Sequence, residues 1–411
     1  MFGWFKDLSD QERKALLAAY GGWSMDAFDV MMYSLLISTL MAAWKMSPGQ
    51  AGFIATSAGL FSAVGGWAAG SLADRFGRVR MLQITIAWFA FFTFLSGFTH
   101  SFEQLLITRS LQGLGFGGEW AVGSILIGEI IRPQHRGKAV GTVQSGWAVG
   151  WGAATILATI FLTLLAEGLA WRALFWVGIL PAILIFYVRK NVREPELSTA
   201  TRQRVQQEGG SFLEIFSPAL MRTTVLASLM STGMQGGYYA VTTWLPTYLK
   251  AERGLSVVGT GGYLVVVIVG SFLGYLAAAY LSDQIGRRNT FFVFAVSSAC
   301  IAGAYTFMSI GNATMLLLGF PLGFFVSGNF SAVGAFLTEL YPSRVRGSGQ
   351  GFAYNFGRAV GALFPTLVGF MSANMNLSTA IGIFSGIAYV IVIIAVSMLP
   401  ETRGKQLEVY D

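Results

Sequence analysis

The sequence predicts an all-α membrane protein with twelve transmembrane helices, and three observations lead to that prediction. Of its 411 residues, 54% are hydrophobic and 11% are charged, whereas soluble domains have about 25% charged residues. Apolar runs long enough to cross ~30 Å of hydrocarbon, about 20 residues each, recur twelve times along the chain. Motifs of the first half return in the second half. We therefore expect a multi-pass protein built from two related sets of six helices.

The apolar runs define the expected spans one after another. We place them at residues 15–43, 50–72, 81–99, 104–130, 138–166, 171–189, 222–249, 258–281, 290–310, 313–338, 347–372 and 378–399. The segment from Phe2 to Lys14 precedes the first span and resembles an interfacial helix. The first span is too long for the core of a signal peptide, so we expect the N-terminus to be retained.

The basic residues between the spans predict the orientation. If the N-terminus is inside, the outer side carries only Lys45, Arg172, Lys250 and Arg253, and most other Lys and Arg residues lie on the inner side. Cytoplasmic loops of membrane proteins carry such an excess of positive charge. Both termini are therefore predicted to be cytoplasmic. The excess of Lys and Arg on the inner side accounts for the net charge of +7. We therefore predict no nucleic-acid partner.

Two loop motifs recur in the two halves. Asp74-Arg75-Phe76-Gly77-Arg78 follows the second span, and Asp283 to Arg288 follows the eighth. Similarly, Glu129 to Arg136 matches Glu339 to Arg346, with acid and arginine equally far apart. A two-fold repeat follows. We expect one half at 1–189, a cytoplasmic linker at 190–221, and the second half with a short tail at 222–411.

The sequence contains no sign of an enzyme. It has no Gly-Lys-Ser/Thr phosphate loop, and its polar loops are too short for a catalytic domain. Cys300, His100 and His135 form no ligand cluster, so no metal site and no cofactor are predicted. Any energy source would have to be an ion gradient, or there is none.

Several motifs together resemble the major facilitator superfamily across nearly the whole chain. They are the Asp74 to Arg78 loop, its copy at Asp283 to Arg288, the run Arg109 to Gly115 and the closing Pro400 to Gly404. Within that superfamily, five stretches resemble the proton-linked organic-acid symporters, which carry sialate, lactate, nicotinate or aromatic acids: Asp26-Ala-Phe-Asp29, Gly117 to Glu119, Gln144 to Gly150, Trp171 to Phe175 and Asn355 to Arg358. The resemblance implies two six-helix bundles, an aqueous cavity between them, and alternating access in the bacterial inner membrane.

The loop motifs have a physical interpretation of their own. Gly77 allows a tight turn, and Asp74 can accept hydrogen bonds from a helix N-terminus or from arginines. Such contacts could form a latch that closes the inner side, and the resemblance favours this role. The alternative is that these residues are only topology signals and turns. The proposed latch residues are Asp74, Arg78, Glu129, Arg136, Asp283, Arg287, Glu339 and Arg346.

Three acids lie at unusual depth within the expected spans. Asp26 and Asp29 belong to the first span and Glu119 to the fourth. A carboxylate at the middle of the bilayer costs at least ~2.5–3.5 kcal/mol, so it normally faces a cavity, is paired, or is protonated. We predict these acids as the proton-coupling residues, with Asp29 foremost. The alternative is that they make hydrogen bonds in the helix packing.

Two arginines within spans are candidates for recognising an anion. Arg358 lies at the depth of the acids, and a guanidinium fork suits a carboxylate. Arg109 lies nearer the outer surface, where it could pair with Asp26 or Asp29 or act as a structural anchor. For Arg358, the alternative to binding a carboxylate is a fixed structural pair.

Other polar side chains at the same depth complete the predicted substrate site: Gln235, Tyr238, Tyr239, Asn355, Gln144, Asn329 and Tyr33. Trp120, Trp147, Trp151 and Trp244 could line the cavity or simply pack. The predicted function is a monomeric, lipid-embedded carrier that imports a small organic anion with protons. A proton/drug antiporter and a non-transporting substrate sensor are the alternatives.

Overall fold

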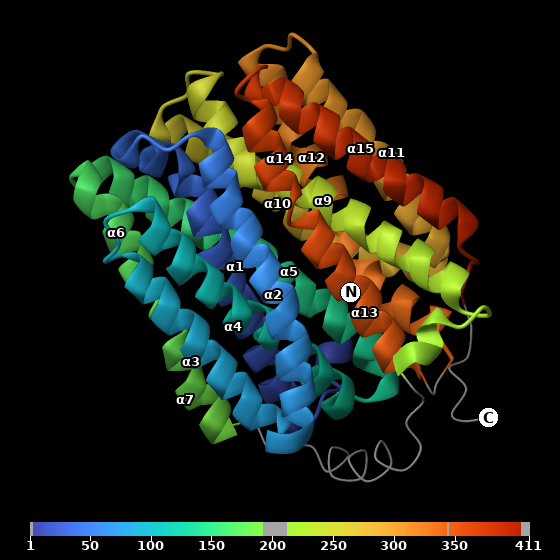
Figure 1. Ribbon diagram of the computed structural model, residues 1–411. Helices are drawn as coiled ribbons and strands as arrows, with labels where there is room; N and C mark the ends of the chain where they lie inside the picture. Colours follow the sequence, from blue (N-terminus) through green and yellow to red (C-terminus); the bar gives the residue numbers. More distant parts are fainter. Residues whose placement is uncertain (1–2, 192–211, 343–344, 404–411) are drawn as a thin grey trace. The chain divides into compact units, whose positions relative to one another are not determined.

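The computed structural model describes residues 3–191, 212–342 and 345–403, and every regular element in these ranges is a helix (Figure 1). The contacts divide the chain into two compact units: unit 1 is Met1–Trp44 with Ser57–Gln206, and unit 2 is Lys45–Thr56 with Gln207–Asp411. The predicted linker, residues 190–221, lies largely outside the described residues. The division into 1–189 and 222–411 therefore stays a prediction.

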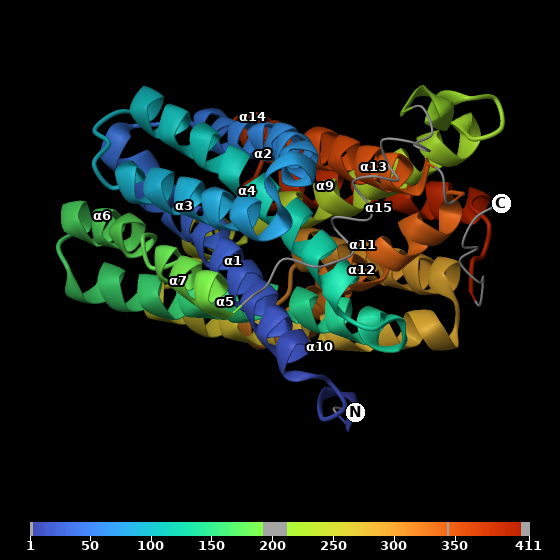
Figure 2. The same cartoon turned by 90° about the horizontal axis from the view of Figure 1, so that it is seen from below.

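Unit 1 consists of long helices followed by two short ones. After a 3₁₀ turn at Gly3–Phe5 come α1 (Asp10–Trp44), α2 (Pro48–Phe76), α3 (Arg78–Ser96), α4 (Phe102–Ile130), α5 (Pro133–Leu164), α6 (Glu167–Val177) and α7 (Ala182–Asn191). The first turns of α2 group with unit 2 and the rest of this helix with unit 1. Figure 2 shows α1, α3, α4 and α5 of unit 1 from below.

Unit 2 also begins with four long helices. A 3₁₀ turn at Phe212–Phe216 precedes α9 (Met221–Ala251), α10 (Val257–Gln284), α11 (Arg287–Phe307), α12 (Asn312–Leu340), α13 (Arg346–Gly361), α14 (Phe364–Met371) and α15 (Leu377–Met398). In the described chain, eight helices are long and apolar enough to cross a membrane by length and composition, and Gly168–Leu184 is a shorter apolar segment.

Two of the expected spans are broken, each at a proline. The span predicted at 171–189 is divided into α6 and α7, and bonds from Ile179 N to Trp176 O and from Ala182 N to Ile179 O form tight turns around Pro181. The span predicted at 347–372 is divided into α13 and α14, with Pro365 in the first turn of α14. Proline has no amide hydrogen and its ring clashes with the preceding turn, so it interrupts a helix but can begin one.

The segment before the first span differs from the interfacial helix expected between Phe2 and Lys14. Helix α1 already begins at Asp10 and continues through the span. Ser9 and Glu12 start it as a capping box: Glu12 N donates to Ser9 Oγ at 3.2 Å, and Ser9 N donates to Glu12 Oε2 at 2.8 Å. Glu12 Oε1 also accepts from Arg132 Nε at 3.0 Å, which ties the start of α1 to the start of α5.

The predicted repeat appears in the packing and in the turns. A Cβ at Gly117 on α4 would overlap the carbonyl of Ser62 on α2, and a Cβ at Gly323 on α12 would overlap that of Val267 on α10. Small residues allow helix backbones to approach this closely in membranes. The predicted turn at Gly77 is confirmed, with φ 98°, and Gly286 has φ 100° at the same place in unit 2.

Candidate functional site

The three acids predicted from the sequence lie inside unit 1 and are almost fully buried. Asp26 and Asp29 on α1 are 1% and 0% exposed, and Glu119 on α4 is 4% exposed. A charge removed from water in this way is expensive unless a partner compensates it. The partner of each acid therefore decides which of them can carry a proton.

Asp29 has a cationic partner. Arg109 Nη1 donates to Asp29 Oδ1 at 3.1 Å and to Oδ2 at 3.2 Å, and Gln112 Nε2 donates to Oδ2 at 2.6 Å. From the sequence, Arg109 could have paired with either Asp26 or Asp29. In the structure it pairs with Asp29. The guanidinium also lies 5.8 Å from the ring centroid of Tyr33 and 5.7 Å from that of Phe175. These contacts make Arg109 the partner of Asp29 in a buried pair.

The pairing predicts the effect of Asp29→Asn. We expect this change to destabilise the protein by about 3–5 kcal/mol, because it leaves the guanidinium of Arg109 buried without its counter-ion. The midpoint of thermal unfolding in detergent measures the loss. The double variant Asp29→Asn/Arg109→Gln should recover part of it, whereas Asp26→Asn should have a smaller effect. A wild-type midpoint for Asp29→Asn would show that the ion pair does not hold the fold.

Asp26 and Glu119 form a second pair of a different kind. Their carboxyl groups, one from α1 and one from α4, are close enough to interact. A hydrogen bond between two carboxyl groups needs a proton on one of them, and two carboxylates at one site cannot both ionise cheaply. Gly22 makes the approach possible, because a Cβ there would overlap Glu119 Oε1. The pair is therefore a place where one proton can be bound.

Aromatic rings of unit 1 surround this carboxyl pair. The ring centroid of Trp23 lies 4.2 Å from that of Trp120, 4.8 Å from that of Trp147 and 6.2 Å from that of Phe116. Trp120 follows Glu119 directly on α4, and Trp23 lies one turn before Asp26 on α1. Two of the four tryptophans predicted to line the cavity or pack, Trp120 and Trp147, thus belong to one aromatic cluster, which keeps much of the water away from the acids.

Arg358 is the buried arginine of unit 2. It lies on α13 with 2% of its surface exposed, and its guanidinium carbon is 5.1 Å from the ring centroid of Tyr354. The side chain of Tyr239 on α9 lies close enough to Arg358 to interact electrostatically with its guanidinium. The predicted site residue Gln235, from the same helix, donates from Nε2 to the carbonyl of Tyr354 at 3.0 Å. Arg358, Tyr239 and Gln235 are thus brought together around Tyr354.

The remaining predicted polar residues lie in different surroundings. Tyr238 is 1% exposed and packs edge-on against Phe330, with ring centroids 5.1 Å apart. The side-chain amides of Asn355 and Asn329 donate back to their own helices, to Gly351 O at 3.0 Å and to Phe325 O at 3.2 Å. Gln144 lies on α5 of unit 1 and is 1% exposed.

Sequence reasoning missed three residues of these clusters: Gln112, Trp23 and Tyr354. Gln112 lies three residues after Arg109 and therefore on the same face of α4. By the same spacing rule, Trp23 shares a face of α1 with Asp26, and Tyr354 shares a face of α13 with Arg358. The spacing could have indicated all three, but it does not say which neighbouring helix each side chain meets.

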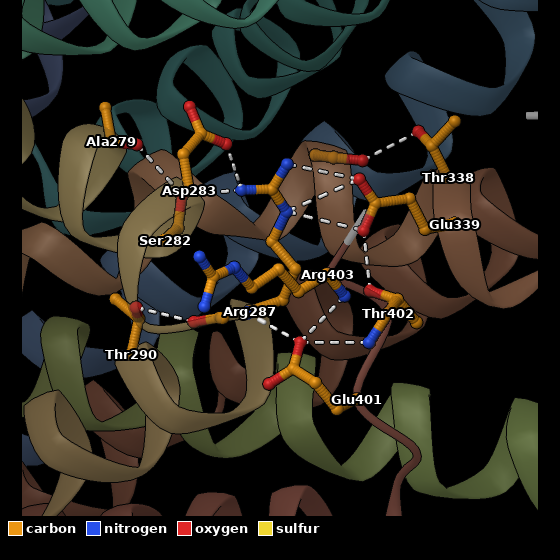
Figure 3. Close-up of polar contacts among 12 residues, drawn as sticks. Ala279, Ser282, Asp283, Arg287, Thr290, Thr338, Glu339, Glu401, Thr402 and Arg403 are labelled. Carbon is orange, nitrogen blue, oxygen red and sulfur yellow. Dashed lines mark hydrogen bonds and ion pairs between the residues drawn. The ribbon is translucent and has the colours of Figure 1, made fainter. Parts of the chain in front are cut away.

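The predicted latch residues of unit 1 have no described side chains. Asp74, Arg78, Glu129 and Arg136 all lie outside the side chains that the structure describes. In unit 2, Asp283, Arg287 and Glu339 come together, as Figure 3 shows. Arg287 bonds to Asp283, and its Nη2 donates to Glu339 Oε1 at 3.2 Å. Arg346 begins α13 and is half-buried.

The closing motif of the chain joins the unit 2 cluster. Thr402 donates its hydroxyl hydrogen to Glu339, and the carboxylate of Glu401 accepts from Arg287 N at 2.8 Å (Figure 3). The same carboxylate accepts from Arg288 N at 3.1 Å. Glu401 therefore caps the N-terminus of α11, where a negative charge is favourable. The sequence identified the motif but not this contact. A role for the cluster as a latch stays a proposal.

Comparisons with known proteins bear on the whole chain. The model of the Major Facilitator Superfamily matches residues 20–365 and 265–409. A probable 4-methylmuconolactone transporter from Cupriavidus pinatubonensis is 41% identical over 411 residues, which cover 99% of this chain and 95% of that protein. The cis,cis-muconate transport protein of Acinetobacter baylyi is 30% identical over 384 residues, covering 92% and 91% of the two chains.

A solved structure shows the same fold. The xylose transporter XylE from E. coli, in an inward open conformation, aligns with a TM-score of 0.76 and 19% identity, over 95% of this chain and 97% of that chain. The family and these relatives are transporters, so the chain is a multi-pass transporter of the inner membrane and not an enzyme. The family match over nearly the whole chain, together with a relative of 41% identity, leads to one conclusion. This chain belongs to the Major Facilitator Superfamily.

Proposed function

We propose that this transporter is a proton-coupled symporter that imports a small organic anion, a carboxylate, by alternating access. The observation that carries the proposal is the buried pair of carboxyl groups, Asp26 and Glu119, in unit 1. A buried acid pair can bind and release a proton, which a carrier driven by a proton gradient requires. The proposed topology has twelve spans with both termini in the cytoplasm.

The assignment of the proton to Asp26 and Glu119 follows from the charges of unit 1. Asp29 is compensated by Arg109 and accepts a further hydrogen bond from Gln112. Protonation of Asp29 would leave the charge of Arg109 without its partner, which is costly for buried groups. Protonation within the Asp26–Glu119 pair instead removes repulsion between two carboxylates. Of the three acids, we therefore assign proton binding to the pair and a positioning role to Asp29.

The carboxylate class of the substrate is supported by Arg358 and by the relatives. A guanidinium donates two parallel hydrogen bonds to a carboxylate, and burial strengthens them because less water competes. Arg358 is buried and lies beside the ring of Tyr354, whose carbonyl accepts a hydrogen bond from Gln235. Muconate, the cargo named for one relative, is a dicarboxylate. We therefore propose Arg358 as the anchor of the substrate carboxylate.

Uptake of labelled cis,cis-muconate into proteoliposomes tests this function. With an inward proton gradient we expect accumulation above the outside concentration, and a protonophore should abolish it. A pH dye should report alkalinisation outside de-energised vesicles when muconate is added. Accumulation that is indifferent to the protonophore would reject proton coupling. Outward movement of muconate against its gradient, driven by the same proton gradient, would favour an antiporter instead.

A further inference from the structure

A small cavity lies inside unit 1 next to the carboxyl pair. Residues from four helices line it: Ala18, Ala19 and Trp23 of α1, Leu82 of α3, Glu119, Trp120, Gly123 and Ile127 of α4, and Val140 and Val143 of α5. The centre of a water molecule has about 20 Å³ available there. A buried water needs roughly 10–15 Å³ measured in this way. The cavity is therefore large enough for one water molecule.

Two polar atoms of the lining residues suit such a water. Among the described residues, neither Glu119 Oε2 nor Trp23 Nε1 has a hydrogen-bond partner. Both side chains are more than nine-tenths buried, at 4% and 7% exposed. Buried polar groups left without a partner cost about 1–3 kcal/mol each. A water that donates to Glu119 Oε2 and accepts from the Trp23 indole would satisfy both atoms.

The lining residues all lie on one side of the acids along their helices. Ala18 and Trp23 precede Asp26 on α1, Ile127 follows Glu119 on α4, and Val140 lies near the start of α5. Ile127 is about 12 Å beyond Glu119 at ~1.5 Å per residue. In the proposed topology, this is the cytoplasmic end of each helix. The cavity thus points from the carboxyl pair toward the side where an importer must release its proton.

We propose that this cavity is a water site within unit 1 through which the Asp26–Glu119 pair exchanges its proton with the cytoplasm. This inference rests on the proposed proton coupling. In the release step, the carboxyl O–H bond breaks and an O–H bond forms on the water. The electron pair stays on the carboxylate, and the hydronium passes its proton toward the cytoplasmic end. Uptake is the reverse step.

Gly123 provides a variant that closes the site. It lines the cavity, and a Cβ there meets no heavy atom of the described residues within 4 Å, so a larger side chain would enter the open space. Gly123→Leu should displace the water while both acids stay in the chain. Gly70→Leu is the matched control, because Gly70 lies within α2, also has open space around its Cβ, and does not line the cavity. Gly123→Ala, which suits a helix better than glycine, is the milder second variant.

X-ray hydroxyl-radical footprinting of the full-length protein tests the water site without any substrate. Radicals form from water at the site, so we expect oxidation of Trp23 but not of the fully buried Trp151. Oxidation of Trp23 should fall several-fold in Gly123→Leu and stay unchanged in Gly70→Leu. No oxidation of Trp23 in the wild type, or equal oxidation in both variants, would overturn the water site.

Transport assays with cis,cis-muconate test the proton route. Proton-driven uptake by Gly123→Leu should slow about tenfold, which corresponds to about 1.4 kcal/mol on the barrier, while exchange of labelled for unlabelled muconate stays near the wild-type rate. Equal rates of proton-driven uptake in Gly123→Leu and Gly70→Leu would overturn the route. If the wild-type protein moves no protons, both the proposed symport and the proton route are wrong. The oxidation of Trp23 tests the water site independently of transport.

Discussion

Glu119→Gln is expected to reduce accumulation driven by a proton gradient to the level of protein-free vesicles, while exchange of labelled for unlabelled substrate continues. Glutamine is nearly isosteric with glutamic acid and can still form a hydrogen bond with Asp26, but it cannot release a proton. Exchange across the membrane needs no net proton release, so it should survive. The measurement is uptake and counterflow of labelled cis,cis-muconate in the same proteoliposomes.

Two further variants sharpen this test. Glu103→Gln removes an exposed acid from the first turn of the same helix, α4, and should leave both assays unchanged. Gly22→Ala keeps all acids but places a methyl group where Glu119 Oε1 lies, so it should impair coupling in the same direction as Glu119→Gln. If Glu119→Gln still concentrates substrate like the wild type, the coupling proton belongs to Asp26 or Asp29 without Glu119.

Arg358→Ala is expected to weaken carboxylate binding by about two orders of magnitude, because truncating one partner of a buried, hydrogen-bonded charge pair costs roughly 2–5 kcal/mol. Arg358→Lys should lie between the wild type and Arg358→Ala, since lysine keeps the charge but cannot donate the two parallel bonds of a guanidinium. Isothermal titration of detergent-solubilised protein with cis,cis-muconate measures both affinities.

The control for loss of charge is Arg253→Ala. Arg253 also belongs to unit 2, but its Nη2 donates to Ile310 O at 2.7 Å and to Asn312 Oδ1 at 2.9 Å. Its removal should leave muconate affinity unchanged. Wild-type affinity in a well-folded Arg358→Ala protein would show that another group holds the carboxylate. A lower unfolding midpoint with unchanged affinity would show that Arg358 is a structural residue.

Much of the candidate site was predictable from the sequence because it depends on local properties. Acids and arginines within apolar spans are conspicuous, since each must be compensated in the membrane. Residues three or four positions apart share a helix face, which places Asp26, Asp29 and Tyr33 on one face of α1. The same rule could have added Gln112 to Arg109, because both lie on one face of α4.

Pairings between helices could not be predicted in this way. Asp26 and Asp29 share one face of α1, so the sequence offered both to Arg109. The rotation and the axial offset of α1 against α4 place Asp29 beside Arg109 and Asp26 beside Glu119. These two quantities depend on how side chains and glycines such as Gly22 pack, and no local pattern in either helix determines them.

The sequence by itself determined the class of the protein, the positions of most helices, the two-fold repeat and the turn at Gly77, because composition, hydropathy and backbone sterics act over a few residues. Only the tertiary structure decided that Glu401 caps the distant helix α11 and that a cavity adjoins Glu119. The physical reason is that these features arise where segments far apart in the chain meet, and the free energy of such contacts depends on their packing together.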